Sequence, residues 1–251
     1  LDTGRGFALL RGLPLDRLGE ALADPLLLAL GAHLGRVVPQ GAGGEAIQRV
    51  ASPAAGAPRW RFHADAADIV ALLVLRQPPE VDPAMLVAAA SVHNEMMKRD
   101  RAALEVLHRP LPHAVPAAAS ASPQVAELPV FSTASGAFVG RYARSAIEAA
   151  QRLPATPRLT AAQVEALDLL DAICAEPGLA LRMEVRAGDV LLFNPLQVWK
   201  RQPEGVEGAE GEAARVALRL MLLTPTSRAL PQGLAQLGAG DAAPASGMVG
   251  G

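Results

Sequence analysis

The stretch His63-Ala-Asp-Ala-Ala-Asp-Ile-Val-Ala-Leu-Leu-Val-Leu75 places a polar pair shortly before a run of apolar residues. The apolar run, Ile69 to Leu75, has the length of a strand and predicts a buried strand. In the polar part, His63 and Asp65 are separated by one residue, so both side chains point to one side of an extended segment. An imidazole and a carboxylate placed in this way can grip a divalent metal together, although His-x-Asp alone is a weak signal.

Apolar runs and periodicities outward from this stretch predict the other elements. We expect a buried strand within residues 6–12, a helix over 24–34, and helices over 91–98 and 100–107. The signals conflict at 82–87, where Asp82-Pro83 favours a helix start and Met85-Leu86-Val87 a strand. Composition predicts loops at 41–58 and 110–123. In the second half we expect a hairpin over 130–139, a helix after the capping box of Thr160 and Gln163, and strands at 181–185, 190–193 and 216–222.

The order of these elements predicts the fold class. Strands dominate the second half and helices lie mainly before and between them, which is typical of a sandwich or jelly roll decorated by helices. We expect one domain over residues 1–231, because barrels and sandwiches of 200–250 residues are commonly single units. Residues 232–251 are mostly glycine, alanine and small polar residues, which predicts a disordered tail.

Composition excludes several classes of protein. The 251 residues carry a formal net charge of −2 and contain no run of lysine or arginine, which argues against nucleic-acid binding. No apolar run approaches the roughly 18 residues of a membrane span. The single cysteine, Cys174, excludes an internal disulfide and fits a reducing compartment, so we expect a cytoplasmic protein. The expected partner is a small-molecule substrate or ligand, and a homo-oligomer is left open.

Several motifs, taken in order, carry a resemblance to a known family. They are Gly-Arg-Gly-Phe-Ala-Leu-Leu-Arg-Gly at 4–12, Gly-Ala-His-Leu-Gly at 31–35, Phe-His-Ala-Asp-Ala-Ala-Asp at 62–68, Ser-Val-His-Asn-Glu-Met at 91–96, Arg-Tyr-Ala-Arg at 141–144, Gly-Asp-Val at 188–190 and Leu-Arg-Leu at 218–220. From Gly4 to about Pro231 the chain resembles the TauD/TfdA family of Fe(II)- and 2-oxoglutarate-dependent dioxygenases, especially its clavaminate-synthase and γ-butyrobetaine-hydroxylase-like branch.

The resemblance implies a double-stranded β-helix, which is a form of jelly roll, decorated by α-helices. It implies Fe(II) and 2-oxoglutarate as cofactors, with His63 and Asp65 as two iron ligands. Arg219 would bind the distal carboxylate of 2-oxoglutarate, a role that suits a planar bidentate donor. The implied activity is the oxidation of a small organic or amino-acid-like substrate.

The third iron ligand of the family is a histidine, and this sequence places Lys200 at its position. All five histidines lie at or before residue 113, so no frame shift can supply another imidazole beyond it. Lys200 would have to lose its proton before it could bind iron, which costs roughly 4–5 kcal/mol at neutral pH from the ordinary pKa of lysine. The simplest alternative is a Lys200–Asp65 ion pair at the metal position.

Three functions therefore stay open at this point. The chain is an oxygenase in which Lys200 or water completes the iron site, a catalytically silent homologue that binds a small acid or a partner protein through the old cavity, or a purely structural subunit. The last would leave His63, Asp65 and Arg219 unexplained. Arg141 and Arg144 flank the single tyrosine, Tyr142, and either reach this cavity or pair with the acidic loop at 204–212.

Overall fold

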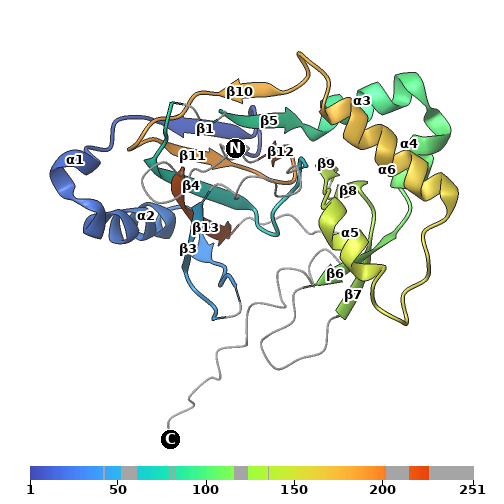
Figure 1. Ribbon diagram of the computed structural model, residues 1–251, viewed down its shortest axis with the longest axis horizontal. Helices are drawn as coiled ribbons and strands as arrows, with labels where there is room; N and C mark the ends of the chain where they lie inside the picture. The colour runs from blue at the N-terminus through green and yellow to red at the C-terminus, as the bar shows by residue number, and fades with distance from the viewer. Residues whose placement is uncertain are drawn as a thin grey trace, which may run out of the picture.

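Two antiparallel sheets form the centre of the molecule, and helices lie at both of its ends (Figure 1). The computed structural model describes residues 1–41, 43–51, 61–79, 81, 83–115, 124–134, 136–201 and 215–225. The predicted tail, 232–251, lies outside the described residues. The larger sheet has the strand order β1-β11-β4-β13-β2, and β3 also pairs with β13. Its strands are β1 (Phe7–Leu10), β2 (Arg36–Val37), β3 (Ile47–Ala51), β4 (Ile69–Arg76), β11 (Val190–Phe193) and β13 (Val216–Leu223).

The predicted strand at 69–75 is confirmed as β4 and lies in the interior of this sheet, between β11 and β13. Its side chains alternate between two apolar clusters. Val70, Leu72 and Val74 face one cluster, whereas the intervening residues face the other. A strand covered on both faces needs apolar residues at every position, which explains its unbroken apolar run.

The smaller sheet has the order β10-β5-β12 and faces one side of the larger sheet. Its strands are β5 (Ala84–Ala88), β10 (Leu181–Met183) and β12 (Val198–Arg201). Leu86 and Val198 pack between the sheets against Leu72 and Phe193 of the larger sheet. The two sheets thus enclose an inner core, as expected for the predicted jelly roll.

The opposite face of the larger sheet is covered by α2 (Ala23–Ala32). Ala23 and Leu27 of this helix pack against Leu218, Leu220 and Leu222 of β13. The predicted alternation in the last strand is therefore confirmed: the leucines face α2, and Arg219 and Met221 lie on the inner face. The short α1 (Leu15–Leu18) and the 3₁₀ helix η1 (Glu20–Leu22) precede α2.

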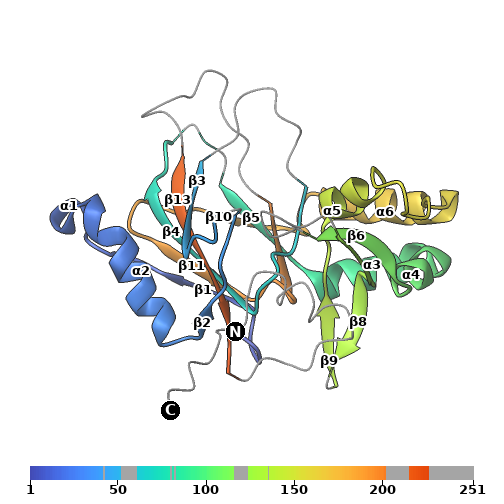
Figure 2. The same ribbon diagram turned by 90° about the horizontal axis from the view of Figure 1, so that it is seen from below.

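A helical layer lies at the other end of the molecule (Figure 2). Its helices are α3 (Ala89–Arg99), α4 (Arg101–Leu107), α5 (Arg144–Ala150) and α6 (Ala161–Cys174). Two strand pairs accompany them: β6 (Leu111–Val115) pairs with β7 (Gln124–Leu128), and β8 (Phe131–Ala134) pairs with β9 (Ala137–Gly140). Helix α6 begins with the predicted capping box of Thr160 and Gln163. Tyr142 and Trp199 join this layer to the sheets through one apolar cluster.

Two predicted loops contain strands. Residues 47–51 form β3 and residues 111–115 form β6, although composition predicted loops at 41–58 and 110–123. Pairing with β13 and β7 provides the backbone hydrogen bonds that local propensity could not reveal. The conflict at 82–87 is resolved in favour of a strand, β5, because residues 84–88 pair with both β10 and β12.

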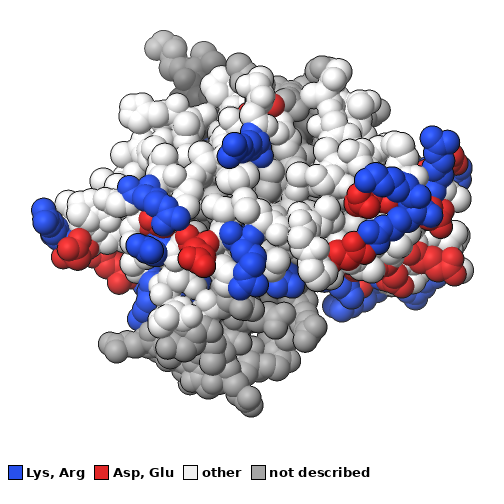
Figure 3. Space-filling view, turned by 90° about the horizontal axis from the view of Figure 1, so that it is seen from above, with Lys and Arg blue, Asp and Glu red and all other residues white. Residues whose placement is uncertain are grey.

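The described surface carries charges of both signs. On the face seen in Figure 3, basic and acidic side chains lie intermixed over the end formed by the helical layer. Several of them are paired, including Lys98 with Glu95 at 2.7 Å and Arg99 with Glu176. None of the helices in the described ranges has the length and apolar character needed to cross a membrane.

Candidate functional site

His63 and Lys200 are held opposite each other by their backbones. The N–H of His63 donates to the carbonyl of Lys200 at 3.0 Å, and the N–H of Lys200 donates to the carbonyl of His63 at 3.1 Å. Lys200 lies in β12, where Val198 packs in the inner core and Trp199 packs in the helical layer. Alternation therefore turns the Lys200 side chain toward the inner core, on the same face as Val198.

The Lys200 side chain joins the two residues of the His-x-Asp motif. Its Nζ lies 3.1 Å from Oδ2 of Asp65 and 3.4 Å from Nε2 of His63. The other ring nitrogen of His63, Nδ1, lies 3.1 Å from the carbonyl oxygen of Arg61. Because a carbonyl only accepts, Nδ1 carries the proton and Nε2 accepts from Lys200. The expected Lys200–Asp65 ion pair is thus present, and its side chains are only 3% and 8% exposed.

Arg219 completes this cluster from β13. Its Nη1 donates to Oδ1 of Asp65 at 2.9 Å, so both carboxylate oxygens accept from cationic side chains. Its Nε donates to Oε1 of Gln40 at 2.8 Å, and its Nη2 donates to Oε1 of Gln48. Gln40 is fixed in turn, because its Nε2 donates to the Arg219 carbonyl at 2.9 Å. Each of the three guanidinium nitrogens of Arg219 is therefore engaged by a protein side chain.

The electrostatics of the cluster follow from burial and mutual charge. Burial alone would raise the pKa of Asp65, but Lys200, His63 and Arg219 together outweigh it and hold this pKa well below its ordinary value. Burial lowers the pKa of Lys200, and the neighbouring Asp65 opposes that effect. Burial, with the charge of Lys200, also lowers the pKa of His63. His63 is therefore neutral at pH 7 and Asp65 is ionised.

This donor set does not fit Fe(II) and 2-oxoglutarate. An iron site of this kind needs three side chains with free lone pairs, and both oxygens of Asp65 already accept hydrogen bonds from cations. Within the described ranges, no three histidine, cysteine or carboxylate side chains converge in a way that could hold a metal. Arg219, which the resemblance assigns to 2-oxoglutarate, is bound to Asp65 and two glutamines instead.

Arg141 and Arg144 point to different surroundings, although both are buried, with 7% and 8% exposure. Arg144 pairs with three carboxylates of the helical layer, namely Glu148 at 2.9 Å, Asp168 at 2.8 Å and Asp171 at 3.5 Å. Tyr142 donates to the same Asp171. Arg144 is thus paired with acidic residues of α5 and α6 and not with Asp65. The acidic loop at 204–212, the other partner expected for it, lies outside the described residues.

Sequence reasoning missed Gln40, Gln48 and His113. Gln48 lies opposite Arg219 in the β3–β13 register, a pairing of residues far apart in the chain that no local pattern signals. Gln40 precedes the stretch predicted as a loop. His113 lies in β6, a strand that was not recognised because the surrounding sequence is rich in alanine and proline. Its side chain is almost completely buried. A buried glutamine or histidine is recognisable as part of a site only once its neighbours are known.

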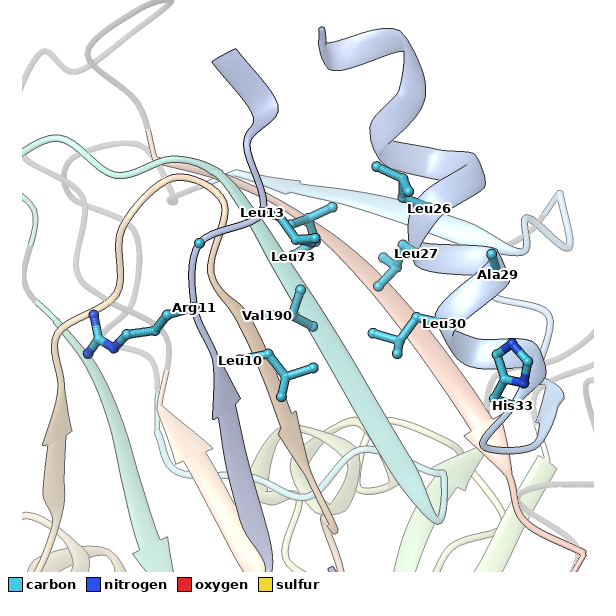
Figure 4. Close-up of a pocket in the computed structure, with 11 residues that line it drawn as sticks. Leu10, Arg11, Leu13, Leu26, Leu27, Ala29, Leu30, His33, Leu73 and Val190 are labelled. Atoms are coloured by element: carbon cyan, nitrogen blue, oxygen red, sulfur yellow. The ribbon is translucent and has the colours of Figure 1, made fainter. Parts of the chain in front are cut away.

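A cavity of about 370 Å³ lies elsewhere, between α2 and the strands β1, β4 and β11 (Figure 4). Leu27, Leu30 and Leu73 point into it, whereas Arg11 extends away from these side chains. Leu27 and Leu73 belong to the apolar cluster on the α2 face of the larger sheet, opposite the face that carries Arg219. The cavity is therefore separate from the charged cluster, and its chemistry is almost wholly apolar.

Comparison with known proteins supports the fold on two levels. The pattern of the family described as "Taurine catabolism dioxygenase TauD, TfdA family" matches residues 2–199. An asparagine oxygenase crystallised with Fe(II), 2S,3S-3-hydroxyasparagine and succinate is similar in structure, with a TM-score of 0.68 and 20% identity over 88% of this chain and 75% of that chain. The non-heme iron oxygenase OrfP, with Fe, succinate and (3R,4R)-dihydroxy-L-Arg, gives a TM-score of 0.62 and 16% identity over 86% and 74%.

At these identities the solved structures establish the double-stranded β-helix alone. No curated protein is similar enough to this chain to add a match. The family pattern covers most of the chain, including the segment from His63 to Asp65 and the strand that leads to Lys200. The chain therefore belongs to the TauD/TfdA family of dioxygenases.

Proposed function

We propose that this chain is a catalytically silent member of its family, which binds a small acid at the position of the old iron site. The observation that carries the proposal is the double engagement of Asp65, whose Oδ2 accepts from Lys200 and whose Oδ1 accepts from Arg219. A metal ion would have to displace both cations from a buried carboxylate. The loss of a partner from a buried ion pair costs about 3–5 kcal/mol, so the cluster competes effectively against iron.

The charge balance of the cluster favours an acidic ligand. Asp65 is the one carboxylate between two cationic side chains, Lys200 and Arg219, and Arg141 is influenced by the same carboxylate. Excess positive charge in a buried region attracts an anion. The structures of the asparagine oxygenase and of OrfP contain succinate and amino-acid derivatives, all of which carry carboxylates. Small carboxylic acids are therefore the first ligands to test.

Metal binding and turnover test the loss of catalysis. The purified chain is titrated with Mn(II) and, without oxygen, with Fe(II) at pH 7 by calorimetry, and succinate formation from 2-oxoglutarate is measured with added Fe(II). We expect no tight metal binding and no succinate above the protein-free background. Tight 1:1 binding, or succinate formation by the unmodified chain, would overturn the proposal.

A single replacement provides the positive control. Lys200→His restores an imidazole at the position where the backbone already holds residue 200 against His63. We expect this variant to bind Mn(II) at least tenfold more tightly than Lys200→Met, which removes the amine without supplying a ligand. Equal binding by the two variants would show that the lysine is not what excludes the metal.

A further inference from the structure

Arg141 is a buried cation that has no ion-pair partner among the described residues. Its Nε has no hydrogen-bond partner, and its guanidinium forms no ion pair within the described ranges. Burial lowers the pKa of Arg141 to about 10, and Asp65 opposes this effect. An unpaired buried charge is expensive for a folded protein, and unsatisfied buried polar groups are rare. Such a group points to a ligand that completes it.

The backbone turns Arg141 toward the charged cluster. The N–H of Ala64 donates to the carbonyl of Tyr142 at 2.7 Å, so the two segments run side by side. Ala64 and Tyr142 both pack in the apolar cluster of the helical layer. Alternation in these extended segments places their neighbours, Arg141 on one segment and Asp65 on the other, on the opposite side.

A second unsatisfied group lies near Arg141. His113 is 1% exposed, and its Nδ1 lies 2.8 Å from the carbonyl oxygen of Leu111, so Nδ1 carries the proton. Its Nε2 is then an acceptor, and it has no hydrogen-bond partner. Because the ring is neutral, His113 cannot serve as a counter-ion for Arg141. Two unsatisfied polar groups, one of them cationic, thus lie near each other.

We propose that Arg141 is the anion anchor of this protein and that a small carboxylic acid binds to the guanidinium edge that carries its unpartnered Nε. The Nε–H belongs to the edge with which arginine binds a carboxylate through paired hydrogen bonds. The inference deepens the proposed function and rests on it, because it names the residue that holds the acid. It departs from the family expectation, in which Arg219 would hold the acid.

The test compares two buried arginines of the same motif. Binding of succinate, 2-oxoglutarate, L-asparagine and L-arginine is measured by calorimetry and thermal shift, with a chelator present so that no metal contributes. We expect at least one acid to bind the parent and Arg141→Gln to weaken that binding at least tenfold, with Arg141→Lys intermediate. Without ligand, Arg141→Gln should unfold at no lower temperature than the parent, because it removes a charge that has no ion-pair partner in the described part of the chain.

Arg144→Gln is the matched control. This variant removes an equally buried but fully paired guanidinium, so it should unfold at a lower temperature while its folded fraction retains the affinity for the acid. The inference is overturned if none of the four acids binds the parent, or if Arg141→Gln binds as tightly as the parent. Tight iron binding in the separate metal titration would overturn the proposed function without changing these chelated measurements, so the two failures are distinguishable.

Discussion

The Nζ of Lys200 lies 3.1 Å from Oδ2 of Asp65, and both side chains are almost completely buried. Buried ion pairs of this kind do not add much stability, but removing one partner leaves a charge without solvent or counter-ion. Variants of this pair therefore test how the charges of the cluster contribute to the free energy of unfolding.

Replacing Lys200 with methionine should lower the free energy of unfolding by about 3 kcal/mol, because Asp65 then keeps only Arg219 as a charged partner. Asp65→Asn should also lower the free energy of unfolding, because no carboxylate would then separate the positive charges of Lys200 and Arg219. The double variant should lose at least about 1 kcal/mol less than the sum of the single changes. Chemical denaturation of all four proteins measures this coupling, and strict additivity would contradict it.

Arg144→Gln should destabilise the helical layer by about 2–4 kcal/mol, because it leaves three carboxylates without the buried guanidinium with which they pair. Arg61 is the matched control: it pairs with Glu148 at 2.7 Å and Asp171 at 3.3 Å, but its side chain is 47% exposed. Arg61→Gln should therefore cost less than about 1 kcal/mol. Equal losses in urea denaturation would refute this distinction.

Gly140→Ala should destabilise the junction between the helical layer and the smaller sheet by about 2–3 kcal/mol. An added Cβ would lie 2.4 Å from Cβ of Ala89 and 3.1 Å from the Trp199 ring, in a region where neither neighbour has room to move. Gly4 has no atom within 4 Å of such a Cβ, so Gly4→Ala should leave the melting temperature nearly unchanged. A melting temperature of Gly140→Ala equal to that of the parent would contradict the close packing.

Stability should fall as the pH drops from about 6.5 toward about 4. Burial and the charge of Arg141 lower the pKa of His113 to about 4. In this pH range His113 is therefore protonated in the unfolded chain but neutral in the folded chain. The full difference corresponds to roughly 3 kcal/mol, which is present above the unfolded pKa and lost on acidification. His63 and His108, whose pKa values are also lowered by burial, act in the same direction.

His113→Asn can keep the donor to the Leu111 carbonyl but does not titrate. Denaturant midpoints measured between pH 7 and pH 4 should therefore fall less steeply in this variant than in the parent. Parallel curves for the two proteins would mean that His113 does not contribute to the acid sensitivity.

The elements that could be predicted are those fixed by residues close together in the sequence. The apolar run at 69–75, the Thr160–Gln163 capping box and the alternation around Arg219 each reflect a local physical requirement, and all three are confirmed. The strands β3 and β6 were not predictable, because they lie in segments whose overall composition is typical of loops. They become strands through their partners, β3 with the distant β13 and β6 with the neighbouring β7.

In the candidate site, too, the residues could be predicted but their contacts could not. His63, Asp65, Lys200 and Arg219 were predicted from motif order, and the structure brings all four together. What no pattern could reveal is how Arg219 is occupied, since Gln40 and Gln48 reach it only through sheet pairing. The contrast between Arg141 and Arg144 was equally hidden, because it depends on which acidic residues of α5 and α6 lie within reach.

The paired backbone hydrogen bonds between His63 and Lys200 bear on which side chains position 200 can carry. They hold position 200 against the His-x-Asp segment whatever side chain it carries, because only main-chain atoms take part. Exchanging lysine for histidine there would thus leave the backbone frame intact, so that one side chain could change the chemistry of the site without a rearrangement of the main chain.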